Sequence, residues 1–333
     1  MILSICEFWV RMASYDKSAD RYDIKHVMGP DEFHEQYPNS NTHGLTNNAY
    51  TNIMVAGLFD RVEELVKELD QEELNAAAKK ASFNPELFET MKDISRKLRL
   101  DINEEGIIGQ FSGYFKLSKL NFDAYRNRYG DISRIDRILK GEGKTPDAYQ
   151  VAKQADTLMA YYELPFDEVD GIIKKMGYNL PENYFSNNLQ YYLDRTTHGS
   201  TLSRIVYSVL DEMNDNMDKS WQLFSTALFS DYYDIQGGTT AEGIHLGVMG
   251  ATLQIETQQY GGVQTYDEKI SISPHLPSLW KKLKFKHNFR GVIYSFEIDH
   301  HNVKVTADKD THVTVKGKVY QVKKDTPLTV KYR

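Results

Sequence analysis

Apolar residues recur at helical spacing through most of the first 258 residues. A segment after Asn47 places five of them on one helical face: Leu58, Val62, Leu65, Val66 and Leu69. Asn84 and Pro85 have the residue types that begin a helix, an N-cap followed by a first-turn proline. The apolar residues after them keep the helical spacing: Leu87, Met91, Ile94 and Leu98. This part of the chain is therefore predicted to consist of helices joined by polar loops.

Thr145 and Pro146 repeat this pair and predict another helix start. The apolar face of that helix would comprise Val151, Ala155, Leu158, Met159 and Tyr162. Further helices are predicted after Phe166, Pro181, Ser200, Asp218 and Thr240. Two connections, 29–47 and 99–121, are long, and long connections in a compact helical domain are usually functional.

The pattern changes near residue 258 to an alternation of apolar and polar residues, which is typical of β-strands. The alternating segments are 292–298, 303–307, 312–315 and 319–322. They predict a small antiparallel β-sandwich over residues 259–333, after a helical domain over residues 1–258. The predicted fold class is thus mainly α with a C-terminal β domain. No alternation of strands with helices is seen, which disfavours a Rossmann or TIM-barrel fold.

Composition and charge narrow the function classes. The chain has 333 residues, of which 41% are hydrophobic, and this is normal for a folded globular protein. Its 40 Lys and Arg against 47 Asp and Glu give a net charge of −7, which argues against a nucleic-acid partner. The single cysteine, Cys6, excludes an intramolecular disulfide and favours a reducing compartment. With no signal peptide and no apolar run of roughly 20 residues, we expect a cytoplasmic protein without a membrane partner.

The first candidate for chemistry is the turn Gly29-Pro30-Asp31, which would present Glu32 at a fixed angle. Cleavage of a glycosidic bond needs a carboxylic acid that protonates the leaving oxygen. Glu32 is therefore a candidate general acid. The alternative is a surface turn with solvated acids, and from this motif alone that alternative is favoured.

Three further segments add to this motif. Lys-Gln-Ala-Asp at 153–156 lies within a predicted helix and faces either a polar cavity or solvent. His-Gly-Ser-Thr at 198–201 and Gly-Gly-Thr-Thr-Ala-Glu-Gly at 237–243 each precede a predicted helix. A helix N-terminus offers unpaired N–H groups, and small hydroxylated residues let an anion reach them. Two such loops could together hold phosphate, although simple N-capping is the better explanation of either loop alone.

Taken in order, five segments resemble the kojibiose/maltose/trehalose phosphorylase family, and the resemblance runs from about Trp9 to the end of the chain. The segments are VMGPDEFHE (27–35), NNAYTN (47–52), KQAD (153–156), HGSTLS (198–203) and GGTTAEGIHLG (237–247). The resemblance implies a partial (α/α) six-hairpin barrel followed by the β-sandwich. It also implies an inverting disaccharide phosphorylase.

The family's pattern assigns roles to individual residues. Glu32 would be the general acid, and Lys153 and Gln154 would bind the sugar. Phosphate would be held by His198, Ser200, Thr201, Gly238, Thr239 and Thr240. The implied reaction converts an α-linked glucosyl disaccharide and phosphate into β-glucose 1-phosphate and a sugar. Inorganic phosphate is then a co-substrate, and no cofactor or metal is expected.

The resemblance leaves several alternatives open. Kojibiose, maltose, nigerose, trehalose and trehalose phosphate all stay candidate substrates, and a homodimer of the full-length protein is open. Only 28 residues precede Gly29, where the family has a long region with part of the sugar site. We therefore expect the C-terminal half of such a protein, with an open barrel, exposed apolar stripes on two helices and little activity alone. The alternatives are a trehalase-like hydrolase, for which Glu242 is the acid in the second loop, and an inactive, interaction-prone fragment.

Overall fold

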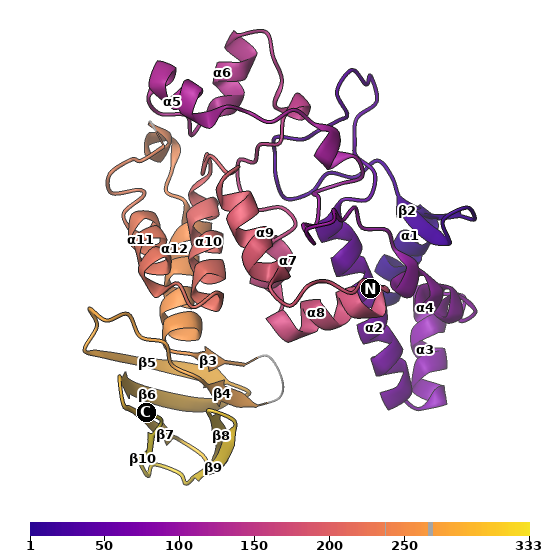
Figure 1. Ribbon diagram of the computed structural model, residues 1–333. Helices are drawn as coiled ribbons and strands as arrows, with labels where there is room; N and C mark the ends of the chain where they lie inside the picture. Colours follow the sequence, from indigo (N-terminus) through magenta and orange to yellow (C-terminus); the bar gives the residue numbers. More distant parts are fainter. Residues whose placement is uncertain (237, 266–268) are drawn as a thin grey trace. The chain divides into compact units, whose positions relative to one another are not determined.

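The computed structural model describes residues 1–236, 238–265 and 269–333 (Figure 1). Contacts between residues divide the chain into two compact units, unit 1 (Met1–Val206) and unit 2 (Tyr207–Arg333). The boundary between the units falls within a helix. The domain boundary predicted at residue 258 stays a prediction.

Unit 1 is built mainly from helices, with one antiparallel hairpin after the first of them. The hairpin consists of β1 (Ala13–Asp16) and β2 (Arg21–Ile24). The helices are α1 (Ile2–Met12), α2 (Ala49–Glu68), α3 (Gln71–Ala81), α4 (Leu87–Lys97), α5 (Phe122–Tyr129), α6 (Ile135–Gly141), α7 (Met159–Glu163), α8 (Phe166–Lys175), α9 (Tyr184–Leu193) and the start of α10 (Thr201–Met213). The helix α2 packs against α4 and α8, as Figure 1 shows.

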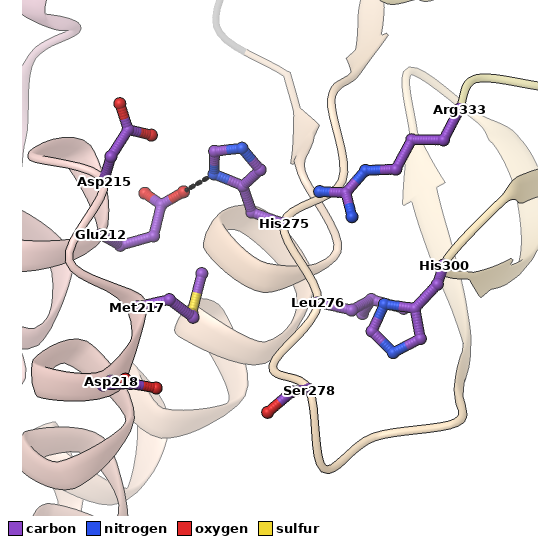
Figure 2. A pocket seen from close by; sticks show the side chains of 9 residues that line it. All are labelled: Glu212, Asp215, Met217, Asp218, His275, Leu276, Ser278, His300 and Arg333. Carbon is purple, nitrogen blue, oxygen red and sulfur yellow. Dashed lines mark hydrogen bonds and ion pairs between the residues drawn. The ribbon is translucent and has the colours of Figure 1, made fainter.

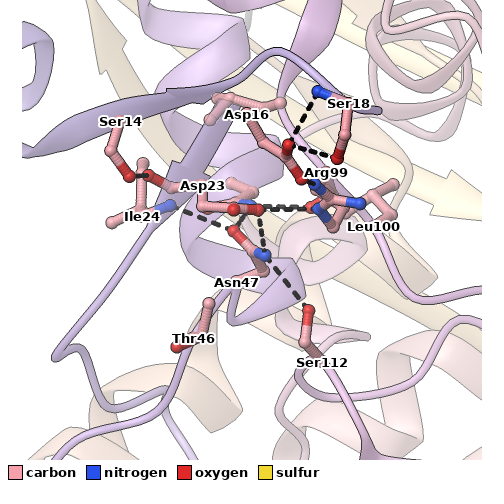
Figure 3. A network of polar contacts seen from close by, with 12 residues as sticks. Ser14, Asp16, Ser18, Asp23, Ile24, Thr46, Asn47, Arg99, Leu100 and Ser112 are labelled. Carbon is pink, nitrogen blue, oxygen red and sulfur yellow. Dashed lines mark hydrogen bonds and ion pairs between the residues drawn. The ribbon is translucent and has the colours of Figure 1, made fainter. Parts of the chain in front are cut away.

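The predicted helix after Asn47 is confirmed as α2, and its start is fixed by two adjacent asparagines. The Asn48 side chain caps the helix by accepting the Thr51 backbone N–H at 2.9 Å. Asn47 stays outside the helix with a φ of 58°. Its side-chain amide donates to Asp23 at 2.8 Å, and Arg99 pairs with the same carboxylate at 2.7 Å (Figure 3). These contacts tie the start of α2 to β2.

The helix predicted from Asn84 and Pro85 is confirmed as α4, which begins at Leu87. Asn84 acts earlier, in a turn where its side chain accepts the Glu86 backbone N–H at 3.1 Å. The helices predicted after Phe166, Pro181 and Ser200 correspond to α8, α9 and α10.

The helix predicted from Thr145 through Tyr162 is wrong. Only a 3-10 turn at Pro146–Ala148 and the short α7 form there. Residues 150–158, here called the KQAD loop, run between them without helical structure. The loop's backbone is bonded to distant segments instead: Ala152 donates to the Arg195 carbonyl at 2.9 Å. The apolar residues of this irregular loop are buried, and their spacing in the sequence happens to match that of a helix.

Unit 2 begins with helices and ends in strands. After α10 come α11 (Met217–Leu228), which confirms the helix predicted near Asp218, and α12 (Leu246–Gln254), which continues into a π-helical turn at Ile255–Tyr260. The helix predicted after Thr240 is wrong in its start. A 3-10 turn at Thr239–Glu242 comes first, and Gly243 interrupts it with a φ of 145°, so α12 begins later. Gly237 of the same predicted loop lies outside the described residues.

Two four-stranded sheets form the C-terminal part of unit 2 and share one core. One sheet has the order β10 (Leu328–Lys331), β7 (Asn302–Ala307), β6 (Val292–Asp299), β5 (Lys282–Phe289). The other has the order β3 (Val263–Gln264), β4 (Ile270–Ile272), β8 (Thr311–Val315), β9 (Lys318–Val322). The four predicted strands are confirmed as β6 to β9, and the fold class is confirmed with them. The purely antiparallel arrangement is wrong at one pair, because β4 pairs with β8 in parallel, with Ile270 opposite Val313.

A cavity of about 330 Å³ lies in unit 2, between the end of α10, the start of α11 and the loop before β5 (Figure 2). Its wall includes an ion pair between Glu212 and His275 at 2.8 Å. The hydrogen bond with Glu212 raises the pKa of His275. The pair therefore connects helix and loop in a way that depends on protonation.

The helix α1 exposes apolar side chains along one side, and the prediction of an open barrel stays a prediction. On α1, the side chains of Ile2, Ile5 and Phe8 are 47%, 42% and 53% exposed, whereas Cys6 is buried. Over the residues that the structure describes, no helix combines the length and apolar character that crossing a bilayer requires.

Candidate active site

A tight turn at residues 29–32, here called the Gly-Pro turn, presents one acidic side chain and buries the next. The Glu32 side chain is 62% exposed, whereas Asp31 is buried. Gly29 has no room for a side chain, since a Cβ there would lie 2.1 Å from Oδ2 of Asp156. The course of the turn therefore depends on a glycine that lets another chain segment approach closely.

The KQAD loop lies along this turn and contacts Glu32 directly. The ammonium of Lys153 forms an ion pair with the Glu32 carboxylate at 2.6 Å. The Lys153 backbone N–H donates to the Asp31 carboxylate at 2.8 Å. The Gln154 side-chain amide donates to the Pro30 carbonyl at 2.6 Å. Unit 1 thus brings the predicted acid and the two predicted sugar-binding residues together, although they lie far apart in the sequence.

Beneath the turn lies a buried charged cluster that the sequence analysis did not assign. Oδ2 of Asp156 accepts the Asp31 backbone N–H at 3.2 Å, and its Oδ1 accepts the Asn48 amide at 2.8 Å. Nδ1 of the buried His34 lies 3.4 Å from the Asp31 carboxylate, and its Nε2 lies 2.9 Å from the Tyr149 carbonyl. The residues Asp31, His34, Asn48 and Asp156 are each at most 4% exposed. The cluster anchors the turn to α2 and to the KQAD loop at once.

Burial controls protonation in this cluster. Desolvation, followed by the neighbouring Asp31 carboxylate, raises the pKa of Asp156 to about 7. Burial alone would lower the pKa of His34, but the contact with Asp31 and its charge outweigh burial, and the net shift is upward. The cluster therefore holds protons close to neutral pH.

The loop that precedes α10 lies against the KQAD loop. Gly199 donates its backbone N–H to the Lys153 carbonyl at 3.1 Å. His198 has a left-handed φ of 52° and its Nδ1 lies 2.9 Å from the Ser203 hydroxyl. Thr201 is buried at the first residue of α10, and Ser200 directly precedes it. Three of the predicted phosphate-binding residues, His198, Ser200 and Thr201, thus lie within two residues of Gly199, which contacts Lys153.

A second cation lies near Glu32 and was not predicted. Arg134 pairs with Asp136 through two hydrogen bonds of 3.0 and 2.8 Å. The pKa of Arg134 is raised mainly by Asp136 and to a smaller extent by the charge of Glu32. The preceding residue, Ser133, accepts the Thr197 hydroxyl at 3.1 Å, which holds this segment beside the loop before α10.

The other predicted phosphate-binding residues, Gly238, Thr239 and Thr240, lie in unit 2. Thr240 donates its backbone N–H to Asp234 and its hydroxyl to Asp231, both at 3.3 Å. The buried hydroxyl oxygen of Thr239 has no hydrogen-bond partner among the described residues. Because these residues belong to the other unit, a phosphate site shared with the loop before α10 stays a prediction.

Comparison with protein families identifies both parts of the chain. Residues 1–254 match the glycosyl hydrolase family 65 central catalytic domain, and residues 263–322 match the glycosyl hydrolase family 65 C-terminal domain.

Curated relatives cover nearly the whole chain. A trehalose 6-phosphate phosphorylase of Lactococcus lactis is 42% identical over 97% of the chain and 40% of its own length. A kojibiose phosphorylase of Caldanaerobacter subterraneus is 28% identical over 96% of the chain and 39% of its own length. The chain thus spans about two fifths of the length of these relatives.

A solved structure, a putative kojibiose phosphorylase from human microbiome, superimposes with a TM-score of 0.75. The sequences are 22% identical, and the match includes 100% of this chain and 45% of the solved one. The solved structure therefore shows that the fold is shared.

Proposed function

The chain belongs to glycosyl hydrolase family 65, and from that premise we propose that the protein phosphorolyses an α-linked glucosyl disaccharide. The observation that carries the proposal is the pairing of an exposed carboxylate, Glu32, with Lys153 on a turn that is held from beneath by buried contacts. A general acid has to reach the leaving oxygen in a fixed geometry, and this arrangement supports such a role.

In the proposed reaction, Glu32 in its protonated form donates a proton to the glycosidic oxygen as the C–O bond breaks. A phosphate oxygen attacks the anomeric carbon from the opposite face. The products are β-glucose 1-phosphate and the released sugar, and the configuration is inverted. Because Glu32 must be protonated to act, we expect Lys153 to leave it when sugar binds and to donate to a sugar hydroxyl. Gln154 would help to hold the same sugar.

An inverting hydrolase needs a second carboxylate that activates water, whereas phosphate is already an anionic nucleophile and needs donors. We propose that the start of α10, with His198, Ser200 and Thr201, supplies part of this anion site. Gly238, Thr239 and Thr240 would supply the rest. The buried Thr239 hydroxyl oxygen, which has no hydrogen-bond partner among the described residues, supports a ligand there. Phosphate would have to displace Asp231 and Asp234 from Thr240.

We further propose a disaccharide phosphate, with trehalose 6-phosphate first, as the substrate. The support is the higher identity to the trehalose 6-phosphate phosphorylase, 42% against 28% for the kojibiose phosphorylase. An anionic substrate also suits a site where Lys153 and Arg134 both lie near Glu32.

The test is a screen of the whole polypeptide that carries this sequence. Trehalose 6-phosphate, trehalose, kojibiose, maltose and nigerose are incubated with and without inorganic phosphate, and glucose 1-phosphate and free glucose are both measured. We expect phosphate-dependent release of glucose 1-phosphate, fastest from trehalose 6-phosphate. Phosphate-independent release of glucose would establish a hydrolase instead, and activity on an unphosphorylated disaccharide alone would refute the proposed substrate.

A further inference from the structure

Asp156 is the residue of the buried cluster that contacts the Gly-Pro turn and α2 together. It is 4% exposed and lies between two donors, the Asp31 backbone N–H and the Asn48 side-chain amide. The same carboxylate occupies the space next to Gly29 in which a Cβ would lie. Any movement of Asp156 would therefore shift the backbone at Gly29 and at Asp31, close to Glu32.

Asp156 also belongs to the loop that supplies Lys153, the ion-pair partner of Glu32. The loop and the turn are joined by the Lys153 contact to Asp31 and the Gln154 contact to Pro30. In those two contacts the KQAD loop donates to the turn. In the third contact the turn donates, because the Asp156 carboxylate accepts the Asp31 backbone N–H. The turn that carries Glu32 and the loop that carries Lys153 are thus joined by these contacts, and the buried Asp156 carboxylate is one of them.

We propose that Asp156 is a positioning residue for the reaction, which fixes Glu32 and Lys153 relative to each other without touching the substrate. The inference rests on the proposed function for its catalytic consequence, whereas the positioning itself is a property of the folded chain. Burial of a carboxylate next to Asp31 is unfavourable, as the raised pKa of Asp156 shows. The carboxylate is held there by the two donors that it accepts, the Asp31 backbone N–H and the Asn48 amide, and these contacts fix the turn.

The first experiment compares two substrates in the whole polypeptide. The disaccharide needs a proton on its leaving oxygen, whereas the fluoride of α-glucosyl fluoride leaves with little acid assistance. We expect Asp156→Ala to lower phosphorolysis of the disaccharide by about 10²–10⁴-fold, the range of general acid catalysis. The rate with α-glucosyl fluoride and phosphate should fall far less, and Glu32→Gln should show the same split. Equal losses on both substrates, or no loss on the disaccharide, would overturn the inference.

A second measurement tests the positioning without turnover. The rate of Lys153 acetylation, followed by mass spectrometry in the folded chain, should rise several-fold in Asp156→Ala because the ammonium is no longer held against Glu32. An unchanged rate overturns the inference even if activity falls. If acetylation rises but the parent protein shows no phosphate-dependent turnover, the proposed function fails and the positioning stands.

Asp60→Ala is the matched control. Asp60 is also a buried acid of unit 1, at 7% exposure, and it pairs with Lys175 on α8 at 3.0 Å. It lies on α2 about 18 Å along the helix axis from Asn48. We expect this variant to leave both the substrate split and the acetylation rate unchanged.

Discussion

The Gly-Pro turn of unit 1 and the Gly238–Thr240 segment of unit 2 are both small polar loops, but different contacts hold them. Contacts of the Gly-Pro turn join residues 121 to 125 positions apart. Contacts of Thr240 join residues 6 and 9 positions apart. The first loop depends on how unit 1 folds as a whole, whereas the second is held by its neighbours in sequence. We infer that the proposed acid is rigidly placed and that the proposed anion loop can adjust to its ligand.

The largest expected effect concerns the group that the first loop presents. Glu32→Gln should lower disaccharide turnover by about 10²–10⁴-fold, because the amide cannot protonate the leaving oxygen. The circular dichroism spectrum and melting temperature should stay close to those of the parent, since the Glu32 side chain is exposed. Glu35→Gln, an exposed acid three residues later, is the control and should keep full activity. A Glu32→Gln rate near that of the parent would refute the acid assignment.

The next effect tests how tightly the first loop is held. Gly29→Ala places a Cβ 2.1 Å from Asp156 and 2.2 Å from Asn48, so it should lower the free energy of unfolding by about 1–3 kcal/mol. Gly171→Ala is the matched control, because its Cβ on α8 meets nothing within 4 Å. That control should stabilise the chain by about 0.5–1 kcal/mol. Urea denaturation measures both, and similar values for the two variants would show that the turn is not tightly packed.

A smaller effect is expected in the second loop. Thr240→Val removes a hydroxyl that we propose donates to phosphate, and one bond to a charged group contributes about 1.5–3 kcal/mol. The KM for phosphate should rise by about tenfold or more, and the free energy of unfolding should change little because the contacts are local. Thr226→Val, at an exposed position of α11, should change neither quantity. An unchanged phosphate KM would remove Thr240 from the proposed site.

The smallest effect is expected at the ion pair between Glu212 and His275 in unit 2. The pKa of His275 is raised by Glu212, so the ion pair's contribution to stability is present below about pH 6.5 and is lost as pH rises through the raised value (Figure 2). His275→Gln should therefore lower the melting temperature at about pH 5.5 and have less effect at about pH 8.5. The exposed His312 supplies the control variant, His312→Gln, which should show no such pH dependence. A loss that is larger at high pH would contradict the sign of this link.

Local pattern predicted α2, α4, α8, α9, α10 and α11 and the alternating strands β6 to β9 of unit 2. It failed in the KQAD loop. There Val151, Ala155 and Leu158 are buried although the segment is irregular, so apolar residues at helical spacing did not indicate a helix. It also failed at Thr240, where Gly243 delays the next helix.

In the candidate site, the resemblance to a family supplied Glu32, Lys153 and Gln154, which the structure brings together. The positions of Asp31 and Asp156 could not be predicted, because each reads locally as a solvated acid. Their burial arises only when segments 125 residues apart meet. Residues that support a site through long-range contacts are thus harder to recognise in a sequence than residues that belong to a known motif.

The proposed function is tested most directly by the configuration of the first product. Proton NMR of the whole polypeptide with trehalose 6-phosphate and inorganic phosphate, recorded early in the reaction, distinguishes the two anomers of glucose 1-phosphate. We predict the β anomer, formed only when phosphate is present. The α anomer, or free glucose formed without phosphate, would contradict an inverting phosphorolysis in which Glu32 acts as the acid.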